Sequence, residues 1–341
     1  MGFTEIIFLF VCLPVSIIIY LISRKVFHCD TICNALLVVL SLLFYLLAGK
    51  QTIVIFLMLS VFTYMAGWLA YDGVTKRIVF PILLLVGILL FYKSFPLLSK
   101  SINGLINTEF ISAGELIAPI GLSFVVFESI SYVVDIYRKN AEPGTILDCL
   151  TFLSLFPKLV SGPIVLWKDF KPQLVNRRVS IEKITSGIDR IIVGYAKKAI
   201  IADTFGVQIA LINSGIAGTG VDTTTMWLRA LLFFFQLYFD FSGYSDIAIG
   251  ISRIFGFDFK ENFNYPYLSK SITEFWKRWH ISLGSWFREY VYIPLGGNRK
   301  GNVYLHLMIV FLLTGIWHGT GCQFLAWGGG TRALCSCRKN D

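Results

Sequence analysis

The sequence predicts an all-α, polytopic integral membrane protein, and three observations carry this prediction. Its 341 residues are 55% hydrophobic and only 15% charged, whereas soluble domains carry about a quarter charged residues. Apolar runs recur along the chain, and about 20 such residues are enough for a helix to cross the hydrocarbon core of a bilayer. Basic residues gather where these runs end. We therefore expect a helical bundle with re-entrant and interfacial amphipathic helices.

The candidate membrane helices follow one another along most of the chain. They cover residues 6–22, 35–48, 52–71, 78–95, 116–137, 188–211, 226–239 (extending to 254) and 303–327. The first run follows Glu5 rather than a basic segment, is too long for the apolar core of a signal peptide, and has no cleavage site of small residues before Arg24. We therefore expect it to remain in the mature protein as the first membrane span.

The placement of basic residues predicts the orientation. Basic pairs follow the first, third and fifth runs, namely Arg24-Lys25, Lys76-Arg77 and Arg138-Lys139. Because cytoplasmic loops carry the excess of Lys and Arg, we expect an extracytoplasmic N-terminus in a multi-pass protein of the cell membrane. The net charge of +9 is dispersed among aromatic residues at the ends of the runs. This pattern favours contact with membrane lipid headgroups over binding of nucleic acid.

Carboxylates inside the apolar runs should point into the protein. Glu128 and Asp135 lie seven residues apart and therefore share one helical face. Asp240 and Asp246 lie six apart and do not share a face. For these two, ion pairing with Lys or Arg of neighbouring elements is the favoured interpretation, and substrate binding is the functional alternative.

Two prolines and a glycine interrupt residues 156–163, Phe-Pro-Lys-Leu-Val-Ser-Gly-Pro, which therefore cannot form a straight helix. Either a re-entrant elbow or a cytoplasmic loop fits this segment. The next stretch, 167–198, is basic and amphipathic, and we expect it to lie against anionic lipid on the cytoplasmic face. Its basic residues are Lys168, Lys171, Arg177, Arg178, Lys183, Arg190, Lys197 and Lys198.

Two of the four histidines are candidates for chemistry. His28 falls in a polar loop, and His306 opens the last run, where packing or snorkelling is the expected role. His280 lies in an aromatic and cationic segment with Trp279, Arg278 and Arg288. These residues suit either a phosphate-bearing donor or an interfacial anchor helix.

His318 lies about two thirds of the way along the last apolar run. An imidazole at such depth usually lines a cavity or takes part in chemistry, although a hydrogen bond to a neighbouring helix is the structural alternative. A neutral imidazole could take a proton from an attacking hydroxyl. The chain contains no GxSxG, HExxH or P-loop motif. Its seven cysteines form no paired CxxC sets, so we expect no metal site.

An ordered set of motifs resembles the membrane-bound O-acyltransferases, specifically the bacterial branch that acetylates alginate or D-alanylates teichoic acid. The motifs are residues 236–250, Tyr265-Pro266-Tyr267 through Leu283, Ile293 to Gly301, Leu313 to Gly319, Phe156 to Ile164, and Leu13-Pro14. The resemblance implies a ring-like helical bundle that encloses a tunnel. It also implies that His318 is the catalytic histidine and that His280 is the second characteristic polar position.

The resemblance covers residues 1–328, which we expect to form one transmembrane domain. Residues 329–341 are a polar tail with two cysteines that matches no motif of the family. The family continues with further membrane helices after the histidine-bearing one. The sequence therefore suggests a frameshift or early truncation near Gly328, which puts the activity of this shortened product in doubt.

Together these observations predict an O-acyltransferase that moves an acyl group, acetyl in the first instance, toward an extracytoplasmic polysaccharide or cell-wall polymer. His318 is the expected base or the residue that positions the acceptor, and His280, Trp279, Arg278 and Arg288 are expected to orient the donor. We expect no bound cofactor. The co-substrate would be a cytoplasmic acyl donor such as acetyl-CoA or an acyl carrier protein, and an extracytoplasmic partner protein would accept the acyl group. The alternative is a transporter or flippase in which Asp240, Asp246 and His318 relay protons.

Overall fold

The described part of the chain is helical. The computed structural model describes residues 5, 7–106, 116–219, 222–319, 321, 323, 324 and 326, and no β-strand occurs among them. The predicted all-α class is therefore confirmed. The chain divides into two compact units. Unit 1 comprises Met1–Phe44, Leu155–Pro163 and Gln173–Asn262, and unit 2 comprises Tyr45–Ser154, Ile164–Pro172 and Phe263–Asp341.

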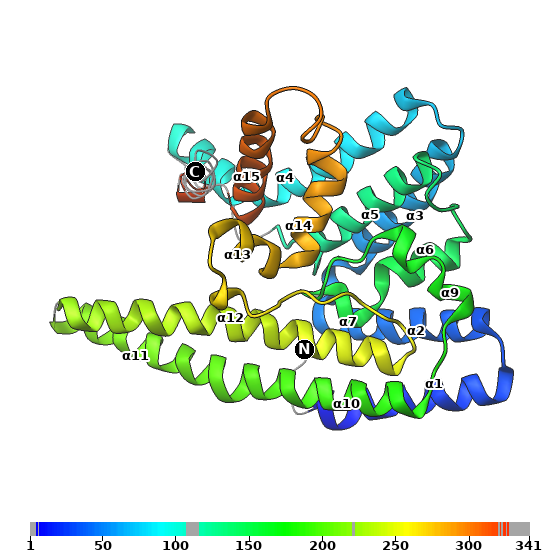
Figure 1. Cartoon of the computed structure of the whole chain (residues 1–341), viewed down its shortest axis with the longest axis horizontal. Coiled ribbons are helices and arrows are strands. Elements are labelled where there is room, and N and C mark those ends of the chain that lie inside the picture. The colour runs from blue at the N-terminus through cyan, green and yellow to red at the C-terminus, as the bar shows by residue number, and fades with distance from the viewer. Residues whose placement is uncertain are drawn as a thin grey trace. The chain divides into compact units, whose positions relative to one another are not determined.

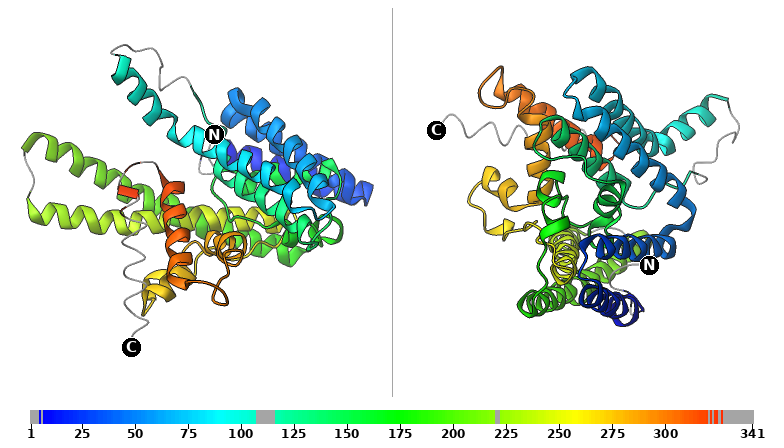
Figure 2. Two further views of the ribbon diagram at one scale, coloured as in Figure 1. Left: turned by 90° about the horizontal axis from the view of Figure 1, so that it is seen from above. Right: turned by 90° about the vertical axis from the view of Figure 1, so that its right-hand side faces the viewer.

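Unit 1 contains both long helices and short helical segments (Figure 1). In chain order they are η1 (Phe8–Cys12), α1 (Leu13–Phe27), the greater part of α2 (Asp30–Gly49), α7 (Phe156–Leu159), α9 (Gln173–Asn176), α10 (Ile181–Tyr195), η3 (Ala196–Ala202), α11 (Asp203–Thr219) and α12 (Thr223–Ile254). Figures 1 and 2 show α11 and α12 as a long helical hairpin.

Unit 2 contains both candidate histidines, His280 between α13 and α14 and His318 at the end of α15. The unit consists of many helical segments. They are η2 (Lys50–Thr52), α3 (Ile53–Tyr71), α4 (Thr75–Ile106), α5 (Leu122–Tyr137), α6 (Ile146–Ser154), α8 (Trp167–Phe170), η4 (Pro266–Leu268), α13 (Ile272–Arg278), α14 (Ile281–Phe287), η5 (Arg288–Tyr292) and α15 (Val303–His318).

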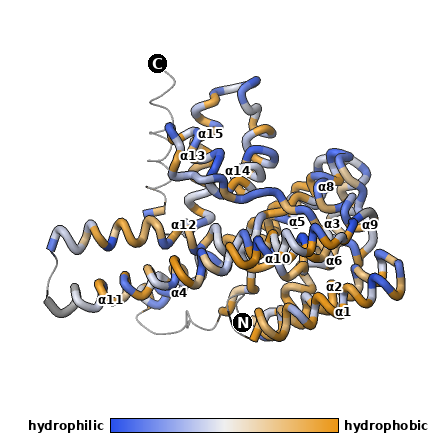
Figure 3. Tube along the Cα trace, turned by 60° about the horizontal axis from the view of Figure 1, so that its bottom comes forward, coloured by the Kyte–Doolittle hydropathy of each residue, from blue (hydrophilic) through white to orange (hydrophobic). Residues whose placement is uncertain are grey.

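Several of these helices are suited to a bilayer. The segments Phe8–Phe27, Asp30–Tyr71 and Thr75–Ile106 are long and apolar enough to cross a membrane, and α15 is a shorter apolar helix. Figure 3 shows α1 and α2 as largely hydrophobic along their length. The α2 and α3 runs are separated by the η2 turn, as their distinct apolar stretches predict. The chain is therefore a membrane protein with several spanning helices.

Glycines bring α10 and α12 of unit 1 into close contact at two levels. A Cβ added to Gly187 would lie 2.7 Å from the carbonyl oxygen of Gly250, and one added to Gly250 would lie 2.6 Å from that of Gly187. Gly194 and Gly243 form a second reciprocal pair, with corresponding distances of 2.6 and 2.7 Å. Small residues of this kind let helix backbones approach closely in membrane proteins. Any larger side chain here must push the helices apart.

The structure corrects the expectation that Arg177 is a surface residue facing lipid. It is 4% exposed within unit 1. Its Nε donates to the Tyr20 hydroxyl at 2.9 Å and its Nη1 to Asn34 Oδ1 at 2.5 Å. Its guanidinium lies 4.7 Å from the ring centroid of Phe257. Buried Arg can be accommodated when its donors are bonded and its plane lies on an aromatic ring, so Arg177 joins α1 and α2 to the end of α9.

The elbow after α6 is also visible. Helix α7 stops at Leu159, and residues 163–166 have no regular structure. Within unit 1, Phe156 and Leu159 are each 2% exposed and Lys158 is 1% exposed. Such burial contradicts an exposed loop and agrees with irregular backbone enclosed by protein.

In unit 2, buried side chains bind the irregular backbone that follows the elbow. Glu128 Oε1 accepts a hydrogen bond from Val165 N at 3.4 Å, and Asp135 Oδ2 accepts one from Lys168 N at 3.0 Å. Between them, Ser131 Oγ accepts from Trp167 N at 3.3 Å. Because buried backbone N–H groups need partners, this polar face of α5 satisfies the irregular residue Val165 and the first two residues of α8, whose N–H groups have no partner within their helix. The prediction that Glu128 and Asp135 share an inward face is confirmed.

Candidate active site

His318 is the last residue of α15. The helix begins at Asn302, whose Oδ1 accepts hydrogen bonds from Tyr304 N at 2.9 Å and Leu305 N at 3.3 Å. It ends because Gly319 adopts extended backbone, with φ 174° and ψ 172°, while its N–H still bonds to Gly315 O. The prediction of one helix over residues 303–327 is wrong, because α15 ends at His318. Apolar composition does not show where a helix ends, and His318 is exposed at the helix terminus rather than enclosed in its interior.

His280 lies at the sharp turn between α13 and α14. Its backbone has φ 43°, a left-handed conformation that non-glycine residues seldom adopt. Its side chain is 4% exposed, and Nδ1 lies 3.5 Å from Ser282 Oγ. The Phe263 ring stacks on the imidazole with centroids 6.4 Å apart. Strained backbone of this kind is typical of functional sites because the surrounding structure must hold it.

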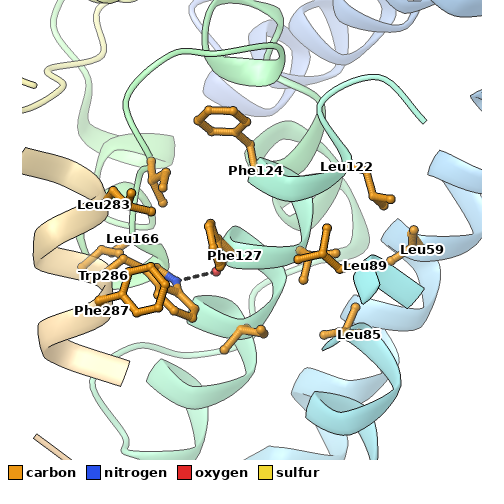
Figure 4. Packing of buried hydrophobic residues seen from close by; sticks show 13 residues of the cluster. Leu59, Leu85, Leu89, Leu122, Phe124, Phe127, Leu166, Leu283, Trp286 and Phe287 are labelled. Carbon is orange, nitrogen blue, oxygen red and sulfur yellow. Dashed lines mark hydrogen bonds between the residues drawn. The ribbon is translucent and has the colours of Figure 1, made fainter. Parts of the chain in front are cut away.

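Trp317 connects the two histidines. Its ring centroid lies 6.3 Å from that of His280 and 4.5 Å from that of His318. It also lies 5.7 Å from Phe127, and it packs against a buried cluster that includes Phe127 and Trp286. Figure 4 shows this cluster, in which Trp286 Nε1 donates to Phe127 O at 2.8 Å. The hydrophobic core thus fixes the indole that separates His280 from His318.

Burial controls the charge of His280, which lies outside the candidate membrane spans. Burial, with a smaller contribution from the neighbouring His318, lowers the pKa of the His280 imidazole to about 3. Two imidazoles this close disfavour each other's protonation. His280 is therefore neutral at physiological pH and is suited to hydrogen bonding rather than to binding an anion by charge.

The predicted donor-binding residues lie in unit 2 but differ in their surroundings. Trp279 stacks on Phe275 with centroids 5.6 Å apart and on Tyr267 at 6.2 Å. Arg278 is engaged locally, since its Nη2 lies 2.8 Å from Glu274 Oε1. Arg288 is exposed at the start of η5. Trp279 therefore adjoins His280, and Arg278 holds its own helix rather than offering an open cation.

Asp240 and Asp246 belong to unit 1 and are both ion-paired. Asp246 Oδ1 accepts from Arg190 Nε at 2.8 Å, and its Oδ2 lies 2.6 Å from Lys197 Nζ. Asp240 Oδ1 lies 2.8 Å from Lys198 Nζ. The predicted structural pairing is confirmed, whereas substrate binding by these carboxylates stays a prediction.

The same pairs revise the expectation that the basic stretch faces lipid. Seven of its eight basic side chains form ion pairs or are buried within their own unit. Lys168 Nζ, for example, lies 3.0 Å from Glu289 Oε1, and Lys171 Nζ lies 2.8 Å from Asp148 Oδ2. Sequence periodicity shows that these cations share faces, but it does not show the carboxylates that meet them.

Sequence reasoning missed Lys93. Its Nζ donates to the carbonyl oxygen of Trp317 and lies 5.7 Å from the centroid of the Trp317 ring. A lone lysine in an apolar run could have been noticed, because ionisable residues within membrane helices are functional candidates. Among the residues that the structure describes, no group of three or more His, Cys, Asp or Glu could hold a metal ion.

A sequence model of the membrane-bound O-acyltransferase family matches residues 42–337, which include every element of this site. The chain belongs to the membrane-bound O-acyltransferase family. Sequence similarity to two individual proteins supports the same conclusion. The chain is 40% identical over 341 residues to the probable alginate O-acetylase AlgI of Pseudomonas putida, covering 96% of this chain and 68% of that protein. It is 32% identical over 362 residues to the peptidoglycan O-acetyltransferase of Helicobacter pylori, covering 94% and 67%.

A more distant relative of the membrane-bound O-acyltransferase family has a different acyl group in its name. The teichoic acid D-alanyltransferase of Bacillus subtilis is 28% identical over 240 residues, covering 65% of this chain and 59% of that protein. The chain thus spans about two thirds of the length of the acetylating relatives. The family resemblance stated from the motifs is confirmed.

Proposed function

We propose that this chain is a membrane O-acyltransferase that moves an acetyl group from a cytoplasmic thioester donor to a hydroxyl of an extracytoplasmic polysaccharide. The proposal rests chiefly on one observation: the Trp317 ring, near the end of α15, contacts the imidazoles of both His280 and His318. Family membership and the names of the acetylating relatives support O-acetylation over other acyl transfers. Acetyl-CoA and an acyl carrier protein are both donors of the required chemistry.

In the proposed reaction, His318 acts as the general base. Its imidazole takes the proton of the acceptor hydroxyl as that oxygen attacks the thioester carbonyl carbon. The new C–O bond forms, the C–S bond breaks, and the proton passes from His318 to the departing thiolate. His318 is exposed at a helix end, so an acceptor can reach it without entering the protein core.

His280 and the aromatic rings would prepare the site for this step. The neutral His280 can exchange a hydrogen bond with substrate without adding a charge near the base. Phe263 and Trp317 flank it with apolar surface, and Phe127 packs against Trp317. A hydrogen bond in such a low-dielectric setting is stronger than in water. Trp279 and Arg288 remain the proposed contacts for the donor.

The proposed route requires an orientation across the membrane. Basic pairs such as Lys76-Arg77 would lie on the cytoplasmic side with the donor, and the N-terminus would be extracytoplasmic. A separate extracytoplasmic protein would receive the acyl group or present the polymer.

Transfer of radiolabelled acetyl groups in membranes tests this function. His318→Ala should reduce transfer by at least about 100-fold, the usual contribution of a general base. His28→Ala is the matched control, because His28 is an exposed histidine at the turn after α1 and should leave transfer unchanged. Equal labelling by the wild type and His318→Ala would contradict the assignment. Movement of a cargo without any acyl product would favour a transporter instead.

A further inference from the structure

Lys93 is a charged residue far inside an apolar helix. It is the only charged side chain of α4 between Arg77 and Lys100, and it lies about 27 Å along the helix axis from Thr75 at about 1.5 Å per residue. The helix is one of the three segments apolar enough to cross a membrane. A lysine at such a position is unfavourable unless protein groups satisfy it, and it therefore suggests a function.

The Lys93 ammonium group is bonded to the backbone beside the proposed base. Nζ donates to the carbonyl oxygen of Trp317, the residue before His318. The last carbonyls of a helix have no partner within the helix and carry its partial negative charge. Lys93 thus contacts the C-terminal end of α15 at the point where a cation is most favourable.

The hydrogen bond from Lys93 is a polar contact of Trp317 with another helix. Among the described residues, the buried indole N–H of Trp317 has no hydrogen-bond partner. The ring is otherwise held by apolar packing against Phe127 and by the Lys93 ammonium 5.7 Å from its centroid. Packing restrains the ring, whereas the bond to the carbonyl attaches the backbone from which His318 projects to α4.

We propose that Lys93 is a positioning residue, which holds the last turn of α15 so that His318 is aimed at the acceptor hydroxyl. This inference rests on the proposed function of His318. Positioning of a catalytic group accounts for a large part of rate enhancement, and a displacement of about 1 Å can reduce the rate about 100-fold. Lys93 acts through the Trp317 carbonyl and forms no covalent bond with substrate.

Steady-state acetyl transfer by the membrane-embedded chain tests the proposal with three variants. Lys93→Met removes the donor at nearly equal size, Lys93→Arg retains a cationic donor, and Lys100→Met removes an exposed lysine of the same helix as a matched control. We expect Lys93→Met to lower kcat by about 100-fold while the KM for acetyl-CoA changes less than about threefold. Lys93→Arg should recover most of the loss, and Lys100→Met should match the wild type.

Three results would overturn the positioning role. The first is an unchanged kcat in folded Lys93→Met. The second is a rise in KM with kcat unchanged, which would place Lys93 in donor binding instead. The third is a kcat of Lys93→Arg no higher than that of Lys93→Met, because a structural apolar contact would not depend on the charge.

A measurement without turnover separates this inference from the proposed function. Hydrogen–deuterium exchange of the backbone amides, followed by mass spectrometry of the peptide that contains His318, gives the rate at which the last turn of α15 opens. Loosening this turn in Lys93→Met should raise that rate at least about threefold, because exchange requires the helix hydrogen bonds to open. Lys93→Arg should resemble the wild type. If the folded wild type transfers no acyl group, the proposed function fails, and an unchanged exchange rate would independently refute the positioning of His318.

Discussion

The two units satisfy buried carboxylates in different ways. In unit 1, Asp246 lies between regular helices and is paired with Arg190 at 2.8 Å and Lys197 at 2.6 Å. In unit 2, Asp135 accepts hydrogen bonds from the backbone of Lys168 at 3.0 Å and from the Tyr290 hydroxyl at 2.9 Å. Regular helices use their own N–H groups internally, so a carboxylate between them needs cationic side chains. The first N–H groups of a helix have no partner within it, so Asp135, which accepts from the first turn of α8, can hold the chain in place.

The largest effect should come from removing the carboxylate in unit 1. Asp246→Asn removes the carboxylate that Arg190 and Lys197 share, so that Arg190 keeps only Glu261 and Lys197 loses this partner. Because breaking a buried ion pair costs about 3–5 kcal/mol, and both cations are partly exposed, we expect a loss of about 3 kcal/mol in the free energy of unfolding. Chemical unfolding of the wild type and the variant in detergent measures this difference in the free energy of unfolding.

Asp240→Asn provides the matched comparison. The Asp240 side chain is 43% exposed and pairs with Lys198, so its removal should cost less than about 1 kcal/mol. Similar losses for the two variants would show that burial does not set the strength of these pairs.

The next effect tests the close packing that surrounds the unit 1 ion pair. Gly187→Leu places a side chain against the Gly250 carbonyl, so the melting temperature should fall by an amount equivalent to about 1–3 kcal/mol, or more if the helices cannot separate. Gly87→Leu in α4 is the control, because no atom lies within 4 Å of an added Cβ. Leucine has the higher helix propensity, so the control should be neutral or slightly stabilising. Equal destabilisation by both changes would rule out the packing explanation.

The smallest effect is expected at the unit 2 carboxylate. Tyr290→Phe removes one hydrogen-bond donor to Asp135 but leaves the backbone of Lys168 in place, so we expect a loss of about 1 kcal/mol. Tyr292→Phe, which removes an exposed bond to Asn298, should change stability by less than about 0.5 kcal/mol. Chemical denaturation compares the two. No difference between them would mean that the Tyr290 hydroxyl does not help to hold Asp135.

Sequence patterns predicted which residues face inward more reliably than they predicted partners. Helical periodicity placed Glu128 and Asp135 on one buried face, and prolines located the elbow after α6. Neither pattern could show that Lys93 reaches the carbonyl beside His318, because 224 residues separate the two. Partners distant in sequence depend on tertiary packing, for which one sequence offers no periodic signal.

The sequence also failed to predict where helices end. The last apolar run continues through Trp327 in composition, yet α15 ends at His318 because Gly319 leaves the helical region. Arg177 was placed with surface cations for a similar reason. Its neighbours in sequence are basic and polar, whereas the rings and amide that enclose it come from α1, α2 and the segment after α12. The motifs identified the candidate histidines, but local composition did not give their exposure.

The two glycine contacts of α10 and α12 have a mechanical consequence. Gly187 and Gly194 are two helical turns apart, as are Gly243 and Gly250, and each pair meets only when the helices have one particular axial alignment. The salt bridge from Arg190 to Asp246 lies between these two points. Sliding by one turn would press larger side chains against backbone at both points and would break the salt bridge. The two helices can therefore move together as one rigid body, but α10 cannot slide along α12 by a helical turn.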